Sequence, residues 1–275
     1  MIRKISLIPI LLLSFFHLIA GSKGEPRIIH TGMVAPDIIS LTIHTGKSEL
    51  GTVQSILPET KVVKQGNQLR VVDNNGNFEG VVIGPEQDHW KAYGKYYGDD
   101  IDWKLLDDGA NYSVEELSGE EVAVGEVYRK SKPTDMIKVG DWGASPAFQF
   151  PMEHLVYLKL EKPLTEGKIY RLSFDSLPLE SRIMEYNSFK QRSTALHVNQ
   201  LGFRPDDPVK TGYLSTWLGK GGSHSYQQEK FHLLDAKKNE IVYTGEIVLN
   251  KEWDKPEGDS PNINYSIINV YELDF

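Results

Sequence analysis

The last third of the chain opens on Ala195-Leu-His-Val-Asn-Gln-Leu-Gly-Phe-Arg-Pro205, a strand-like run that breaks at Gly202 and Pro205. Such a break is typical of a strand that ends in a turn. Further strand-like runs follow it, and Asp235-Ala-Lys-Lys-Asn239 has the composition of a hairpin loop between two of them. The expected strands lie near 195–201, 210–217, 230–235, 240–249 and 264–275. This pattern predicts a separate β-sandwich over 195–275.

The opening run resembles the first strand of the immunoglobulin-like module that precedes the catalytic barrel in glycoside hydrolase family 9, the cellulase family. The resemblance continues through Lys210-Thr-Gly-Tyr-Leu, Phe231-His-Leu-Leu-Asp-Ala, Ile241-Val-Tyr-Thr-Gly245 and Asn269-Val-Tyr-Glu-Leu-Asp-Phe275. In the family, the last of these phrases leads directly into the catalytic domain. The resemblance therefore implies a non-catalytic module and a catalytic (α/α) barrel C-terminal to Phe275.

The residues that would cut a glycosidic bond are not found. Hydrolysis needs two carboxyl groups across the bond, and in the resembled family the paired aspartates sit in an Asp-Ala-Gly-Asp motif that this sequence lacks. We therefore assign no catalytic residue and expect the chain alone to be inactive. By resemblance, the complete enzyme would degrade β-linked glucans by inversion. Phe203, Trp217 and Phe275 would pack the module against the barrel.

The N-terminus has the pattern of a secretory signal peptide. Met1-Ile-Arg-Lys4 is basic, residues 5–16 are apolar, and Ile19-Ala-Gly-Ser22 offers small residues for cleavage near residue 21. A transmembrane anchor is the alternative, but the apolar run is shorter than the ~20 residues that a spanning helix needs. We therefore expect a secreted or periplasmic protein with no transmembrane anchor after cleavage.

Composition narrows the class of partner. The formal net charge is −8, which disfavours nucleic acid because nucleic-acid binding depends on neutralising phosphates with Lys and Arg. No basic stripe offsets this charge, and Lys130-Ser-Lys132 is expected to be a solvated loop. The chain has no cysteine, so stability must come from a buried core. No histidine pair has helical zinc spacing, so neither a metal nor another cofactor is expected.

Short alternating runs between Gly, Pro, Asn and Asp also predict an all-β fold for the upstream part. The alternating segment Ile39-Ser-Leu-Thr-Ile43 is one expected strand, and Leu69–Val72 and Gly80–Ile83 flank the turn signal Asp73-Asn-Asn-Gly76. Leu155–Leu160 and Ile169–Phe174 are expected to pair across a loop. Together these segments predict a first β-sandwich over about 26–188, so the chain is expected to contain two tandem sandwiches.

Three segments depart from this alternation. Residues 85–127 are acidic and aromatic and are interpreted as an insertion, in which Ser113-Val-Glu-Glu116 has the spacing of a helix-capping box. Tyr186–Thr194 is polar and suits an inter-domain linker. Gly219-Lys-Gly-Gly-Ser223 lacks the pattern of a phosphate-binding loop and is expected to be a flexible turn.

The acidic and aromatic segment also contains the candidate carbohydrate site. Flat sugar faces could stack on Trp90, Tyr96 or Trp103, which would suit a free-standing protein that binds β-glucan or another polysaccharide. The alternative is that these aromatic rings pack the edge of a sandwich. The aspartates of 99–108 could hold calcium, although their spacing does not fit a calcium-binding loop. A third hypothesis is an adhesion or assembly protein, since tandem sandwiches serve many functions.

Overall fold

The computed structural model describes residues 24–141, 143–258 and 262–275. Within these ranges nearly all regular structure is β-strand, and the helical segments are short: α1 (Trp103–Leu106), η1 (Gly109–Asn111) and η2 (Gly219–Gly221). The all-β prediction is therefore confirmed. No helix in the described part is long and apolar enough to span a bilayer. The expected signal peptide, residues 1–21, lies outside the described residues.

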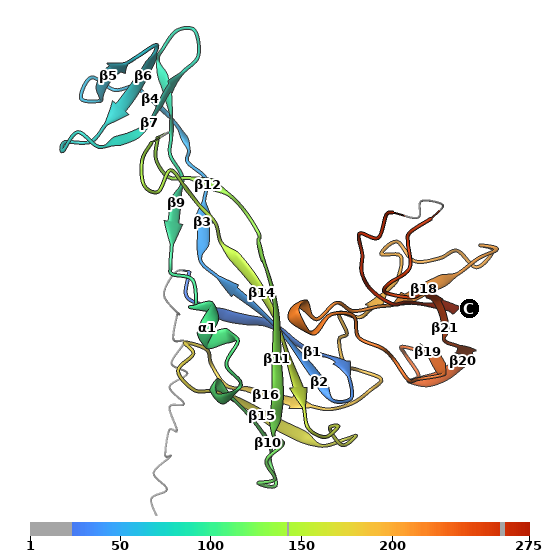
Figure 1. The fold of residues 1–275 in the computed structure, drawn as a ribbon. Helices are drawn as coiled ribbons and strands as arrows, with labels where there is room; N and C mark the ends of the chain where they lie inside the picture. The colour runs from blue at the N-terminus through green and yellow to red at the C-terminus, as the bar shows by residue number, and fades with distance from the viewer. Residues whose placement is uncertain (1–23, 142, 259–261) are drawn as a thin grey trace, which may run out of the picture.

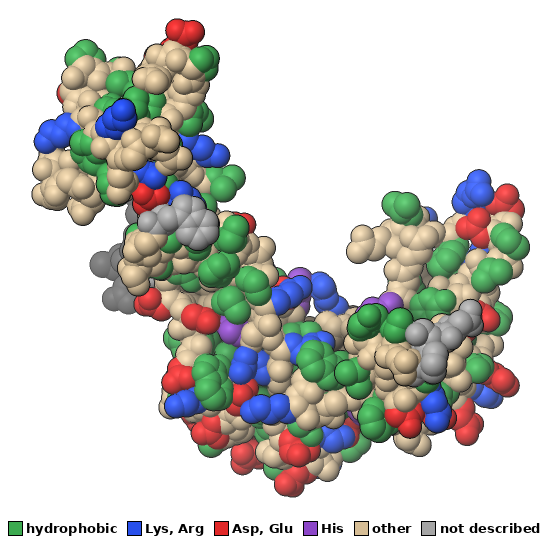
Figure 2. Space-filling model, turned by 45° about the horizontal axis from the view of Figure 1, so that its top comes forward, with side chains coloured by type: hydrophobic (Ala, Val, Ile, Leu, Met, Phe, Trp, Pro, Cys, Tyr) green, Lys and Arg blue, Asp and Glu red, His purple; other side chains and the backbone are tan. Residues whose placement is uncertain are grey.

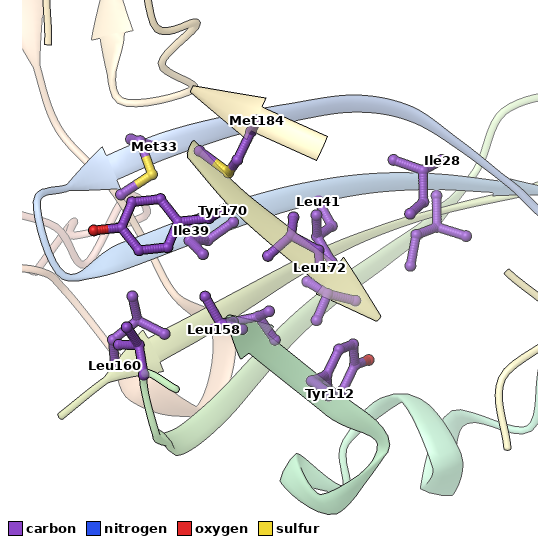
Figure 3. Packing of buried hydrophobic residues seen from close by; sticks show 14 of the residues in the cluster. Ile28, Met33, Ile39, Leu41, Tyr112, Leu158, Leu160, Tyr170, Leu172 and Met184 are labelled. Carbon is purple, nitrogen blue, oxygen red and sulfur yellow. The ribbon is translucent and has the colours of Figure 1, made fainter. Parts of the chain in front are cut away.

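The upstream part is built on two antiparallel sheets packed face to face, which we call the body (Figure 1). The larger sheet has the order β1-β2-β14-β11 and the smaller β10-β15-β16. The strands are β1 (Arg27–Ala35), β2 (Ile38–Thr45), β14 (Met152–Leu160), β11 (Val124–Pro133), β10 (Tyr112–Glu116), β15 (Ile169–Phe174) and β16 (Arg182–Glu185). Between the sheets, Leu41 and Leu158 point toward Leu172, as Figure 3 shows.

The alternation of β2 determines both faces of the larger sheet. Ile39, Leu41 and Ile43 point into the sandwich core and are fully buried. Ser40 and Thr42 point to the opposite, outer face, yet they are only 3% and 9% exposed. The outer face is therefore partly covered, which simple alternation of apolar and polar residues did not predict.

Two local predictions for the body were wrong. Leu155–Leu160 and Ile169–Phe174 do not pair, because β14 lies between β2 and β11 whereas β15 lies between β10 and β16 in the other sheet. The helix expected at Ser113 is instead strand β10, in which Val114 is buried against the core and packing outweighs the capping pattern.

An arm formed by residues 47–97, with 134–150 against its base, projects from the body (Figure 1). The paired strands at its base are β3 (Lys47–Glu49) with β9 (Lys95–Tyr97), and β12 (Ile137–Lys138) with β13 (Phe148–Gln149). Its tip is a sheet of β4 (Val53–Ser55), β8 (His89–Ala92), β7 (Phe78–Ile83), β6 (Gln68–Val72) and β5 (Lys61–Gln65), in that order. The hairpin at Asn75-Gly76 is confirmed, with Gly76 at φ 85°.

The projecting segment does not coincide with the insertion expected over 85–127. That range contains β8 and β9 of the arm, but also α1, β10 and the beginning of β11, which belong to the body. The insertion starts earlier, at Lys47, because β2 continues directly into β3. Lys130-Ser-Lys132 likewise lies in β11 and not in a loop.

The C-terminal module, residues 195–275, has a sheet in the order β17-β18-β22-β21 and a separate hairpin of β19 and β20. The strands are β17 (Leu196–His197), β18 (Thr211–Leu214), β22 (Val270–Asp274), β21 (Val248–Lys251), β19 (Lys230–Asp235) and β20 (Glu240–Glu246). The predicted loop between β19 and β20 is confirmed, and Asn239 takes the left-handed conformation there, with φ 58°.

The segment before the module contains no helix or strand between residues 187 and 194. It nevertheless lies against β1, where the backbone N–H of Met33 donates to the carbonyl of Arg192 at 2.9 Å. A Cβ atom on Gly32 would lie 2.2 Å from the same carbonyl oxygen. The close approach requires glycine at residue 32.

Candidate functional site

The outer face of the larger body sheet packs against the C-terminal module through one cluster of buried residues. The body contributes Val34, Ile38 and Tyr157, and the module contributes Ala195, Leu214, Leu218, Tyr226, Tyr271 and Leu273. Figure 1 shows the module beside this sheet. Burial of apolar surface stabilises by about 25 cal/mol per Å². The body and the C-terminal module therefore form one packed interface, which we call the seam.

Tyrosine hydroxyls within the seam are hydrogen-bonded. The hydroxyl of Tyr226 lies 3.0 Å from Oγ1 of Thr216, and its backbone N–H donates to the Tyr271 hydroxyl at 3.1 Å. Burial is the main cause of the raised pKa of Tyr226. With their polar atoms satisfied, these rings fill the seam without the cost of unpaired buried groups.

The glycine-rich stretch expected to be a flexible turn is part of the seam. Gly219 begins η2, and a Cβ atom there would lie 2.3 Å from the carbonyl oxygen of Arg129 in β11. Lys220 Nζ lies 3.7 Å from Oδ2 of Asp107, and Asp107 also pairs with Arg129 at 2.7 Å. The sequence signal missed here is Gly-x-Gly, which permits a close backbone approach.

A buried histidine links the body to the segment before α1. His154, only 2% exposed, has Nδ1 2.8 Å from Ser131 Oγ and Nε2 2.8 Å from Asp100 Oδ1. Thr45 donates to the same Asp100 oxygen at 2.7 Å. Burial opposes ionisation of Asp100, but the hydrogen bonds from Thr45 and His154 outweigh it and lower the pKa.

The residue types of this network are those of a hydrolytic triad, but its placement differs. Ser131 lies on the regular strand β11, and its Oγ also accepts from Nη1 of Arg129. A catalytic serine is instead presented to substrate beside donors for the oxyanion. The arrangement satisfies a buried imidazole and joins β2, β11 and β14.

Aromatic rings gather at the end of the module where β22 finishes. The ring of Phe275 lies edge-on to Phe203 at 5.4 Å and to Phe231 at 6.4 Å between centroids. The backbone N–H of Phe275 donates to the Lys210 carbonyl at 2.9 Å. We call Phe203, Phe231 and Phe275 the aromatic end. Two of the three residues expected to pack against a barrel therefore lie together.

Trp217, the third, lies elsewhere. β18 and β22 are antiparallel, with Thr211 opposite Asp274 and Leu214 opposite Tyr271. Trp217 follows the Leu214 end and forms a bridge with Ser223, whereas Phe275 lies at the Thr211 end. A single flat partner surface at the aromatic end would not reach it.

A comparison of the chain with known families agrees with this geometry. Residues 191–270 match the family model described as the cellulase N-terminal ig-like domain. The resemblance predicted from the sequence is thereby confirmed, and the C-terminal module is called the Ig-like domain below. No curated protein and no solved structure matches the chain.

The candidate carbohydrate residues do not form one platform with the Ig-like domain or with each other. Trp90 lies on β8 in the arm, is 8% exposed, and covers Gly80 so closely that a Cβ there would lie 2.6 Å from the ring. Tyr96 lies at the base of the arm in β9 and is partly buried. Trp103 begins α1 on the body and is 53% exposed. Of the three, Trp103 has the most open ring.

Four of the five aspartates of 99–108 have individual structural partners. Asp102 accepts from the backbone of Lys104 at the start of α1, and Asp108 does the same for Ala110 at η1. Asp107 pairs with Arg129, and Asp100 binds His154. Among the residues that the structure describes, no three His, Asp or Glu side chains form a group that could hold a metal.

Proposed function

We propose that the chain is the N-terminal, non-catalytic part of a secreted family 9-type glycoside hydrolase that degrades polysaccharide. Its role would be to hold a catalytic (α/α) barrel C-terminal to Phe275. The match of residues 191–270 to the cellulase N-terminal ig-like domain carries this proposal.

In this proposal residues 1–21 are a cleaved signal peptide, 26–188 form an arm-bearing β-sandwich domain and 195–275 form the Ig-like domain. The packed seam supports a brace function, because Leu218 and Tyr226 of the Ig-like domain are buried with Tyr157 of the body. A partner bound to the Ig-like domain would then be held in a defined position relative to the body. The barrel would contact the aromatic end.

The reading frame beyond the Phe275 codon tests the proposal. We expect it to encode an Asp-Ala-Gly-Asp motif followed by amphipathic helices, and a stop codon directly after Phe275 would overturn the proposal. In parallel, the 275-residue chain should release no reducing ends from carboxymethylcellulose, because it lacks the paired carboxyl groups. Release by the pure chain would contradict the non-catalytic role.

A matched pair of variants in the complete enzyme tests the contact. Val209 is 68% exposed beside Lys210, the residue that binds the Phe275 backbone, whereas Ile267 is 52% exposed beyond the opposite end of β22. We expect Val209→Ser to lower the melting temperature of the barrel and Ile267→Ser to leave it unchanged. Equal effects would place the barrel elsewhere.

A free-standing carbohydrate-binding protein is the second candidate, and the exposed ring of Trp103 favours it. Pull-down on insoluble cellulose and xylan separates the two functions. Retention that is lost in Trp103→Ala would support the binding protein, and no retention would support the brace.

A further inference from the structure

Beyond the seam, the outer face of the larger body sheet continues toward the arm, with exposed side chains at its edges such as His30 on β1 and Lys132 on β11. The strand register arranges this face in rows across β11, β14, β2 and β1. In the row Tyr128–Tyr157–Ser40, Tyr157 belongs to the seam and Tyr128 packs against it. The following rows, toward the arm, are Lys130–Leu155–Thr42–His30 and then Lys132–Glu153–His44.

Basic side chains predominate in these two rows, although Leu155 packs against the seam and Thr42 is 9% exposed. We call the basic side chains of the two rows, together with Arg192 from the linker, the basic floor. Nη1 of Arg192 donates to Nε2 of His30 at 2.9 Å, which places the guanidinium over β1. Figure 2 shows Lys, Arg and His side chains in the hollow between the arm and the Ig-like domain. The members of the basic floor are His30, His44, Lys130, Lys132 and Arg192.

Glu153 is the carboxylate within these rows, and it is already neutralised. It lies 2.9 Å from Nε2 of His44 and 3.0 Å from Nζ of Lys132. Burial opposes its ionisation, but the bonds from His44 and Lys132 prevail and lower its pKa. The pair leaves little negative charge to repel an anion.

Lys130 and Arg192 have no such partner. Among the described residues, no carboxylate lies within ion-pair distance of either side chain. The ammonium of Lys130 stands 5.2 Å from the centre of the Tyr157 ring. Burial, and then the charge of Lys132, lowers the pKa of Lys130, so an incoming anion would relieve an existing electrostatic cost.

We propose that the basic floor binds one chain of an anionic polysaccharide, through carboxylate groups such as those of uronic acids. The site is a strip two rows wide on the face of a sheet, so it suits a single extended chain. A duplex nucleic acid is a poorer fit, because its phosphates would also face the acidic remainder of a protein with net charge −8. The proposed function supports only the choice of a polysaccharide; the charge arrangement stands without it.

Two double variants that each remove two positive charges test the site. Lys130→Gln with Arg192→Gln changes the floor, whereas Lys237→Gln with Lys238→Gln changes the exposed loop between β19 and β20. Affinity electrophoresis of the full chain in gels containing polygalacturonate measures binding, with hydroxyethylcellulose as the uncharged comparison. We expect the floor variant to bind polygalacturonate about tenfold more weakly, as the loss of two weak ion contacts predicts, and the loop variant to bind as wild type does.

Salt and a second variant complete the test. Binding should weaken between about 0.02 and 0.2 M salt, because salt screens exposed charges. Should Lys130→Gln unfold the protein, Lys132→Gln with Arg192→Gln carries the same test, since both side chains are exposed. Failure of wild type to bind, equal affinity of the two double variants, or equally tight binding of a DNA duplex would each overturn the proposal. None of these results depends on the reading frame beyond Phe275, so the two proposals fail separately.

Discussion

Nε2 of His154 and Oδ1 of Asp100 lie 2.8 Å apart although 54 residues separate them in the chain. The contact fixes the segment that leads into α1 against the N-terminal end of β14. Thr45, which is fully buried on β2, donates to the same oxygen. The pKa of Asp100 is lowered as a result, despite the opposing effect of burial.

This network predicts a pH-dependent stability. An aspartate with a lowered folded-state pKa contributes stability above its ordinary pKa of about 3.9, and the contribution is lost as the pH falls through the folded value. Thr45→Val should therefore reduce the free energy of unfolding by about 1 kcal/mol at pH 7. This value is below the usual contribution of a hydrogen bond to a charged group, because the Asp100 side chain is 47% exposed to solvent. The difference from wild type should shrink below about pH 3.9.

Urea denaturation across pH 2.5–7 measures this effect. Thr42→Val is the matched control, since Thr42 lies on the same strand and points to the opposite face. A Thr45→Val deficit that stays constant down to pH 2.5 would contradict the role of Asp100.

The seam is expected to weaken in mild acid because of His224, whose ring lies edge-on to that of Tyr226 at 4.6 Å between centroids. Burial, followed by the charge of Lys159, lowers the pKa of His224. A histidine with a lowered folded-state pKa binds fewer protons when folded, so stability falls as the pH drops below about 6.5 and levels off below the folded pKa. His224→Gln should remove this slope, and His232→Gln, an exposed histidine bonded to Thr244, should not. Thermal melts between pH 5 and 8 measure this dependence of stability on pH. If His224→Gln keeps the same dependence, the ionisation of His224 is not its cause.

Gly219 predicts how the seam can be opened. Gly219 and Gly202 have φ of 70° and 74°, so alanine is strained at both, but only at Gly219 does the Cβ meet backbone, 2.3 Å from the Arg129 oxygen. Gly219→Ala should therefore cost about 1–3 kcal/mol more than Gly202→Ala and speed tryptic cleavage of the linker at Lys190. Indistinguishable cleavage rates would mean that η2 does not support the seam.

Trp90 and Trp103 are expected to respond differently to truncation. Trp90→Ala removes a ring that is 8% exposed and should cost the arm about 3–5 kcal/mol, visible as faster amide hydrogen exchange in β6 to β8. Trp103→Ala removes an exposed ring and should change stability by no more than about 0.5 kcal/mol. Fast exchange confined to α1 in Trp90→Ala would show that the arm does not depend on this ring.

Sequence reasoning worked best where the signal is local. The hairpin turns at Gly76 and Asn239 depend on neighbouring residues, and the match over residues 191–270 confirms a pattern that was visible in Ala195–Pro205. Pairing between distant strands carries no such local signal. β14 therefore pairs with β2, more than 100 residues upstream, instead of with the next strand along the chain.

The basic floor and the separation of the candidate carbohydrate residues could not be predicted from the sequence for the same reason. Lys130 and Lys132 are two residues apart in β11, but Arg192 and His30 reach them only through the fold. The net charge indicates an acidic protein and gives no sign that the five members of the basic floor share one face. Trp90 and Trp103 show the converse, since they are close in sequence and lie in the arm and on the body.

The close fit of the linker on Gly32 supplies a criterion for recognising the same architecture from sequence. The Arg192 carbonyl occupies the space that any larger residue at position 32 would fill, and Gly219 plays the equivalent part against Arg129. A glycine in the first strand of the body together with Gly-x-Gly after the second strand of the Ig-like domain would thus form a two-part fingerprint. Chains that keep both glycine signals would hold their Ig-like domain in a fixed orientation against the body. Chains that lose either would carry an Ig-like domain that moves relative to the body.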